Sequence, residues 1–197
     1  VSATDMASSG EDFGIENRIL APAEKELMFF ILTHGREFLE FESDSEYYTP
    51  KALTVFDFIR STLDEDGTSF ANSVYRNAYD AYKQLYDTGM DQDAIIKTLL
   101  NSSDRILANV AVQLSTSRYQ LTVKNFEKAL TTTSSWLTSF VPRTLMRYGE
   151  RRLQDRIENI RASLSSMDRE SQIEAMKELV KLQSIKTEIK KQYGKNL

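Results

Sequence analysis

Apolar residues recur at intervals of three and four along most of the chain, which is the spacing that places them on one face of an α-helix. Two runs show the pattern most clearly: Leu53, Phe56, Ile59 and Leu63, and Leu153, Ile157, Ile160 and Leu164. Only 7 glycines and 3 prolines interrupt the 197 residues, too few for the many tight turns of an all-β protein. The sequence therefore predicts an all-α fold.

The larger part of the chain, residues 22–141, is expected to form a multi-helix bundle. A first helix is predicted at residues 23–34, with Pro22 at its start and Gly35 as the C′ residue that ends it. Residues 37–41 alternate between polar and apolar side chains, which predicts a short extended piece after this helix.

The remaining helices of the bundle are predicted from capping residues and apolar spacing. Thr49 followed by Pro50 predicts the start of the second helix. The third, at residues 68–88, carries four tyrosines, which we interpret as part of the core rather than as a platform for stacking bases. Three shorter helices are expected after Asp91, after Ser102 or Ser103, and at residues 123–130.

A different pattern begins at Pro142. One long helix is predicted from there to about residue 165, after a break at residues 131–135, where threonines and serines compete for backbone hydrogen bonds. Asp168 is expected to cap a second long helix that lasts to about residue 193. The short connection between the two makes them antiparallel. The predicted fold is thus a multi-helix bundle followed by a C-terminal antiparallel helical hairpin.

Charge divides the chain at the same place. Residues 1–141 hold 12 basic and 21 acidic side chains, a net charge of −9, and residues 142–197 hold 13 and 8, a net charge of +5. We therefore expect residues 1–21 to be a linker or cloning remnant, residues 22–141 an acidic helical bundle, and residues 142–197 a basic helical hairpin. The chain begins at Val1 without a signal sequence, so we interpret it as a piece of a longer protein rather than a secreted precursor.

The sequence offers little material for catalysis or metal binding. It has no cysteine and a single histidine, His34, which is expected at the end of its helix, where the helix dipole favours it, rather than as a base. Phosphate-binding glycine loops, dinucleotide fingerprints and protease or hydrolase motifs are absent. We therefore expect no enzyme activity, cofactor, metal or small-molecule substrate. No run of 18 apolar residues occurs, so no membrane contact is expected, and the lack of cysteine fits a cytoplasmic location.

The second hairpin helix has more apolar positions than one partner helix can cover. Leu179 with Val180, then Leu182 with Ile185, spread around its circumference. A helix of this kind often presents its surplus apolar surface to another protein. The alternative is that the surplus folds back onto the bundle. The hypothesis of a protein partner therefore requires apolar side chains of the hairpin that face solvent.

Arginines form two rows on the first hairpin helix. Arg143, Arg147 and Arg151 lie four residues apart on one face, and Arg152 and Arg156 form an adjacent row. We consider the first row a candidate contact for nucleic acid or for an acidic partner. The alternative is an ordinary solvated face, in which arginines pair with carboxylates one helical turn away.

Together these segments resemble the C-terminal helicase-interacting domain of bacterial DnaG-type DNA primases, a helical bundle followed by a helical hairpin. The opening helix at residues 24–32 is similar to the first bundle helix of that family, and residues 56–59, with the acidic turn and Phe70 after them, are similar to its next section. The strongest likeness lies in the hairpin, at residues 151–164 and 178–191. The resemblance extends over roughly residues 23–197.

The resemblance implies a role in DNA replication. The zinc-binding module and the polymerase core of the primase would lie upstream, and this part would dock the primase onto the N-terminal domain of the replicative helicase, chiefly through the hairpin. Basic charge on the final helix would favour an acidic patch on the helicase, and a weak contact with DNA would be secondary. Two alternatives stay open: a helical nucleic-acid-binding module, and the N-terminal domain of a replicative helicase itself. The residues expected to contact the helicase are Leu182, Lys186, Ile189, Lys190 and Tyr193.

Overall fold

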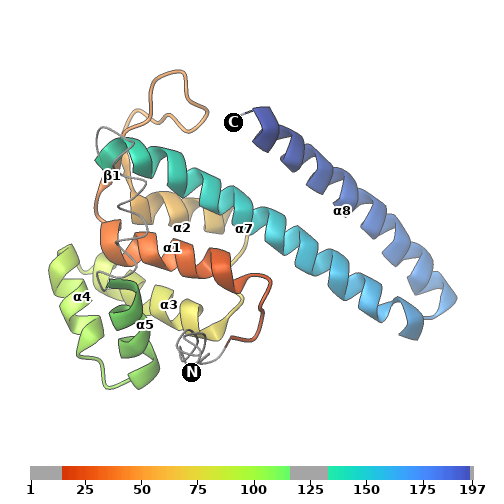
Figure 1. Cartoon of the computed structure of the whole chain (residues 1–197), viewed down its shortest axis with the longest axis horizontal. Helices are drawn as coiled ribbons and strands as arrows, with labels where there is room; N and C mark the ends of the chain where they lie inside the picture. The colour runs from red at the N-terminus through yellow and green to blue at the C-terminus, as the bar shows by residue number, and fades with distance from the viewer. Residues whose placement is uncertain (1–14, 116–132, 196–197) are drawn as a thin grey trace, which may run out of the picture.

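The structure, a computed structural model, describes residues 15–115 and 133–195, and it leaves the side chains of residues 133–135, 190 and 192–195 undescribed. The helix predicted at residues 123–130 therefore lies outside the described residues. Figure 1 shows a bundle of short helices from which a long arm of two helices, α7 and α8, projects and folds back at its tip. The prediction of an all-α bundle with a C-terminal antiparallel hairpin is confirmed.

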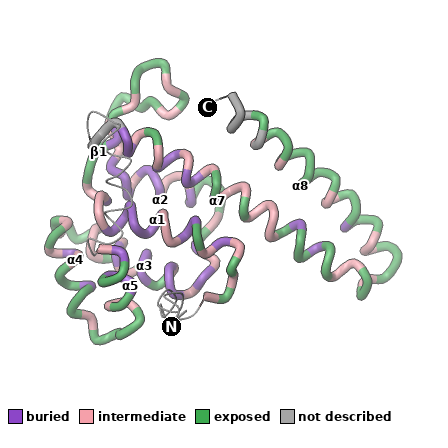
Figure 2. Tube along the Cα trace, viewed as in Figure 1, coloured by how far each residue is buried: buried purple, intermediate pink, exposed green. Residues whose placement is uncertain are grey.

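Helix α1 (Ala21–His34) runs through the middle of the bundle. Residues 27–32 are all buried, so the helix is enclosed on every side rather than along one stripe. Figure 2 shows that the buried residues gather in this bundle and are sparse along the arm. The helices that contact α1 are α2 (Val55–Glu65), α3 (Ser73–Asp87), α4 (Gln92–Leu100), α5 (Arg105–Ser115) and α7 (Thr133–Ser163).

A two-stranded antiparallel sheet precedes α2. β1 (Phe38–Leu39) pairs with β2 (Leu53–Thr54), so the predicted extended piece is confirmed. The N-cap of α2 is Thr54, whose Oγ1 accepts a hydrogen bond from the Asp57 amide at 3.1 Å. The predicted start at Thr49 is wrong, because the strand pairing keeps the chain extended up to the residue before the helix.

Aspartate side chains cap the two short helices that follow α3. α4 begins directly after Asp91, as predicted, and Asp91 Oδ1 accepts a hydrogen bond from the Ala94 amide at 2.8 Å. α5 is capped by Asp104 instead of the predicted serines, since Asp104 Oδ1 accepts a hydrogen bond from the Ile106 amide at 2.8 Å. Both carboxylates satisfy amides that a helix start otherwise leaves unpaired.

The tyrosines of α3 belong to the core, as predicted. Tyr75, Tyr79 and Tyr82 are buried and Tyr86 is half-buried. Burial raises the pKa of Tyr79 to about 12, and burial also raises the pKa of Tyr82. Both phenols therefore stay protonated at neutral pH.

α7 is one continuous helix where a break and a new start were predicted. It begins at Thr133, inside the stretch expected to interrupt the chain, and passes through Pro142 without ending. The predicted start at Pro142 is wrong. Trp136, Leu137 and Val141 are buried in the bundle core, and this burial outweighs the one hydrogen bond that the proline removes. The bundle and the arm consequently share a helix.

The end of the expected linker is also folded. Ile15 and Leu20 pack on the core. The Asn17 amide donates a hydrogen bond to Asn72 Oδ1 at 2.7 Å, and the Asn17 side chain donates to Asp155 of α7 at 2.8 Å. The linker prediction is wrong for residues 15–21, of which Ala21 already begins α1, because these long-range contacts cannot be read from local composition. Residues 1–14 lie outside the described part of the chain.

Candidate protein-interaction surface

The arm consists of the second half of α7 and of α8 (Arg169–Lys195), joined by a 3₁₀ turn at Leu164–Ser166. Three of the four residues predicted as a seam, Leu153, Ile157 and Ile160, lie on α7 and the fourth, Leu164, lies in the 3₁₀ turn; all four are buried or half-buried. α8 is packed more loosely, and of its described side chains only Ala175 is buried. Elements with few buried contacts are those that open most easily. The arm is therefore the weakly held part of the molecule.

Two polar contacts link α8 to α7. Arg156 forms an ion pair with Glu178 at 3.0 Å, and Lys186 Nζ donates a hydrogen bond to Gln154 Oε1. Both side chains of the ion pair are solvent-exposed, and exposed pairs contribute about 1 kcal/mol or less. These contacts align the two helices but contribute little to the stability of their packing.

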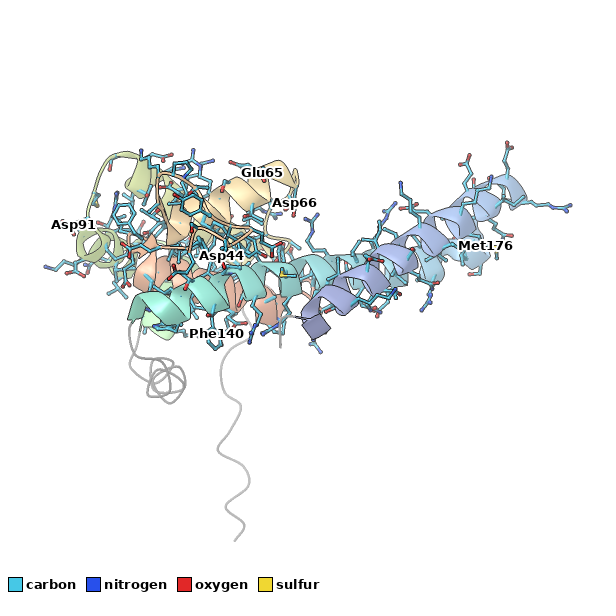
Figure 3. All side chains as sticks on the ribbon, turned by 90° about the horizontal axis from the view of Figure 1, so that it is seen from above. Asp44, Glu65, Asp66, Asp91, Phe140 and Met176 are labelled. Atoms are coloured by element: carbon cyan, nitrogen blue, oxygen red, sulfur yellow. The ribbon has the colours of Figure 1, made fainter. Side chains whose placement is uncertain are left out.

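An exposed flank of α8, outside the face that packs against α7, is apolar. Ile173, Met176 and Val180 are 50, 58 and 68 % exposed, at the spacing that puts them on one helix face. Figure 3 shows Met176 toward the far end of the arm, away from the bundle. We call these three residues the α8 stripe. The expected solvent-facing apolar surface of the hairpin is confirmed.

The residues predicted to contact the helicase lie elsewhere on α8. Leu182, Lys186 and Ile189 are half-buried, and Lys186 reaches Gln154 of α7. They share the face that packs against α7, and their role in binding stays a prediction. Lys190 and Tyr193 belong to α8, but their side chains lie outside the described residues. The spacing of the α8 stripe was visible in the sequence, but the sequence does not tell which apolar face of the helix turns inward.

The predicted arginine row is partly engaged within the chain. Arg147 forms an ion pair with Glu26 of α1 at 2.9 Å. The guanidinium carbon of Arg143 lies 5.7 Å from the centre of the Phe140 ring, and Arg151 is exposed. The pair with Glu26 interrupts the row at its middle. The row therefore offers less unbalanced positive charge than its sequence spacing suggests, and its contact with a partner stays a prediction.

A groove of about 660 Å³ lies where the arm leaves the bundle. Ile189 of α8 borders it on one side, and its charged lining mixes Arg152 and Arg156 with Asp66 and Asp155. A lining with both signs of charge does not favour a phosphate or a cation. Within residues 15–115 and 133–195, no group of three His, Cys, Asp or Glu side chains is placed to hold a metal ion.

His34 ends α1, as predicted. Its Nδ1 lies 2.7 Å from Glu37 Oε1, and its ring packs edge-on against Trp136. The histidine thus has local partners at a helix C-terminus, where the dipole favours a positive charge.

A buried polar cluster that the sequence did not reveal anchors the arm to the bundle. Glu24 of α1 is 0 % exposed, and its carboxylate accepts hydrogen bonds from the amides of Ala71 and Asn72, from the Asn72 side chain and from the Tyr148 hydroxyl of α7. The two amides lie at the start of α3, so the carboxylate fixes that start at Ser73 and not at residue 68 as predicted. Burial and then the charge of Glu24 raise the pKa of Tyr148, which stays a protonated donor.

Asp168 caps α8, as predicted, and gives the arm a pH dependence. Its carboxylate accepts hydrogen bonds from the Ser171 amide at 2.9 Å and the Ser171 hydroxyl at 3.0 Å, and these bonds hold the pKa of Asp168 below its usual value. Because the folded pKa is lowered, the cap stabilises α8 above the ordinary aspartate pKa and is lost as pH falls through the lowered value.

We therefore expect the Ser171 amide resonance to titrate with an apparent pKa below 3.8. Asp168→Asn keeps a capping side chain that does not titrate, so this variant should abolish the shift. An identical titration in both proteins would show that the cap is not its origin.

The fold and its exposed stripe define a helical bundle with a projecting hairpin arm. Residues 14–196 match the family described as a domain of unknown function (DUF8430), and the chain belongs to that family. No curated protein and no solved structure matches the chain. None of the helices in the described part of the chain is both long and apolar enough to span a membrane.

Proposed function

We propose that this chain is a non-catalytic protein-interaction domain of a bacterial DNA primase, which docks the primase onto the replicative helicase during DNA replication. The observation that carries the proposal is the arm, a hairpin that leaves the bundle and keeps apolar side chains in solvent. Exposed apolar surface of this kind marks interaction sites on soluble proteins. The resemblance of the hairpin to that of primases supplies the partner, and the proposal implies a cytoplasmic location.

The charge distribution favours a protein partner over nucleic acid. The chain as a whole carries a net charge of −4. Arg147 and Arg156 on α7 are both paired with carboxylates. Strong nucleic-acid binding depends on several cations that neutralise successive phosphates. A contact between the arginine row and DNA is therefore secondary in this proposal.

The loose packing of α8 suits a contact that must form and break. An arm held by few buried side chains can adjust its two helices on a partner at small cost within its own fold. The bundle supplies the rigid base, because α7 is common to both parts. A reversible contact of this kind is what recruitment of a primase to a moving helicase needs.

Removal of the arm tests the proposal. A chain that ends at Arg156 keeps the contacts of Arg147 and Tyr148 with the bundle, and it removes the buried seam residues Ile157 and Ile160 together with α8. We expect the full chain to bind the purified replicative helicase of the same organism in calorimetric titrations, and the shortened chain to bind at least about tenfold more weakly. Circular dichroism of the shortened chain checks that the bundle is still folded.

Two results would contradict the proposal. One is equal binding of the folded shortened chain and the full chain to the helicase. The other is no helicase binding by the full chain, together with tight binding to single-stranded DNA that weakens steeply with salt, which would favour the nucleic-acid-binding alternative.

A further inference from the structure

The α8 stripe occupies one row of a heptad pattern. At 3.6 residues per turn, positions 169, 173, 176, 180, 184, 187 and 191 line the same face of α8. The face that packs against α7 is marked by the buried Ala175 and by Lys186, which bonds to Gln154 of α7, and it lies more than a quarter turn around the helix from this row. The stripe therefore lies on an exposed flank of α8, outside the face that packs against α7, and its three apolar side chains are open to a partner.

Positive charges outnumber negative charges around the stripe. Arg169 precedes it and Lys191 follows it on the same row, and Lys177 lies one helical turn from both Ile173 and Val180. All three cations are exposed, and none forms an ion pair with another described residue. Glu170, one turn before Ile173, is the carboxylate nearest the stripe, while Glu174 lies farther around the helix and Glu178 is already paired with Arg156.

A second copy of the chain does not fit this face. An antiparallel pairing of two stripes brings Lys177 of each copy close to Lys177 of the other, and a parallel pairing does the same for Arg169. Like charges opposed in this way oppose association. Three partly exposed side chains also cover much less than the roughly 800 Å² per partner of a standard stable interface. The face suits a small, reversible contact with a different protein.

We infer that the α8 stripe, rather than the inward face of α8, is the docking face, and that its occupant is an apolar patch bordered by carboxylates on the replicative helicase. The inference rests on the proposed function and specifies where on the arm the contact lies. Apolar burial of Ile173, Met176 and Val180 supplies the attraction, while Arg169, Lys177 and Lys191 set the orientation and speed the encounter.

Charged substitutions in the stripe test the inference on the full chain. We expect Met176→Glu and Val180→Glu each to weaken helicase binding by about tenfold or more, since each places a carboxylate against an apolar, acid-rimmed patch. Ile106→Glu is the matched control, because Ile106 is 46 % exposed on α5 of the bundle, and it should bind within about twofold of the unchanged chain. All these positions are exposed, and circular dichroism verifies that each variant is folded.

Two further measurements test which face of α8 binds the helicase and whether the patch on the helicase is acidic. Lys186→Ala, on the inward face, should leave binding within about twofold. Added salt should weaken the binding of the unchanged chain. It should weaken the binding of the double variant Arg169→Gln with Lys177→Gln to a smaller extent, because this variant has lost part of the electrostatic attraction that salt screens.

The possible failures are distinguishable. Stripe variants that bind like the unchanged chain, while the chain ending at Arg156 does not bind, would overturn the inference and leave docking by the arm intact. A loss in Lys186→Ala with no loss in Val180→Glu would assign the contact to the inward face. Sedimentation that shows a dimer of the full chain, dissociated by Val180→Glu, would make a second copy the occupant. No binding by the full chain would refute the proposed function itself.

Discussion

Replacement of Glu24 by glutamine is expected to lower the free energy of unfolding by about 3 kcal/mol. The buried carboxylate accepts hydrogen bonds on both oxygens, from two backbone amides, the Asn72 side chain and the Tyr148 hydroxyl. Glutamine has nearly the same shape, but one of its two polar atoms is a donor. The amide nitrogen of the glutamine would face hydrogen-bond donors, and no water is there to accept from them. The stability is therefore lost because buried polar groups are left unpaired, and not because a cavity forms.

Urea unfolding measures this loss, and a matched substitution two residues along α1, on another side of the helix, controls for it. Glu26→Gln removes a carboxylate that pairs with Arg147 near the surface, so it should cost less than about 1 kcal/mol. A Glu24→Gln protein within about 0.5 kcal/mol of the unchanged chain would show that the cluster does not hold the bundle and α7 together.

The second large effect is expected for Gly35→Ala, about 3 kcal/mol of destabilisation. Gly35 ends α1 in an ordinary right-handed conformation, with φ −55°, so it is not the left-handed C′ residue that its position suggests. The glycine is needed for space, because a Cβ atom there would overlap the Tyr82 hydroxyl and the Ile31 carbonyl oxygen. Tyr82 is fully buried and its hydroxyl donates to Gln92 at 2.6 Å, so packing and this hydrogen bond both oppose its displacement.

Gly149 provides the control for this substitution. It lies within α7, and a Cβ atom built on it meets nothing within 4 Å. Gly149→Ala should therefore stabilise the protein by about 0.5–1 kcal/mol, because alanine is the better helix former and nothing opposes it. Thermal unfolding of the two alanine variants should move in opposite directions. Destabilisation of both would mean that glycine serves a conformational role at position 149 as well.

Prediction from sequence succeeded where a helix carries its own boundary signals. Asp91 and Asp168 cap α4 and α8 as expected, because each carboxylate binds amides within its own first turn. Prediction from sequence failed where a contact with a residue far away in the chain sets the boundary of a helix. The start of α2 follows from pairing with β1, the start of α3 from Glu24, and the continuity of α7 through Pro142 from burial of its first turns in the core. None of these contacts has a local pattern.

The same division applies to the candidate surface. The hairpin, its seam on α7 and its surplus of apolar residues could be predicted, because heptad spacing is a property of the helix alone. The sequence could not predict which of these residues are exposed. α8 has apolar residues on more than one face, and the side chains that α7 presents decide which face packs inward. Leu182 and Ile189 were chosen from sequence, whereas the exposed apolar positions of α8 are Ile173, Met176 and Val180 on one face and Ile185 on another.

By itself, the sequence determined that this protein is helical, that it ends in an antiparallel pair of long helices, and that its positive charge gathers there, since spacing, caps and composition act within a few residues. The tertiary structure alone decided that α7 joins bundle and arm as one helix, that a buried carboxylate ties them, and which side of α8 meets the solvent. These outcomes depend on contacts between residues far apart in the chain, and burial decides among alternatives that are locally equal.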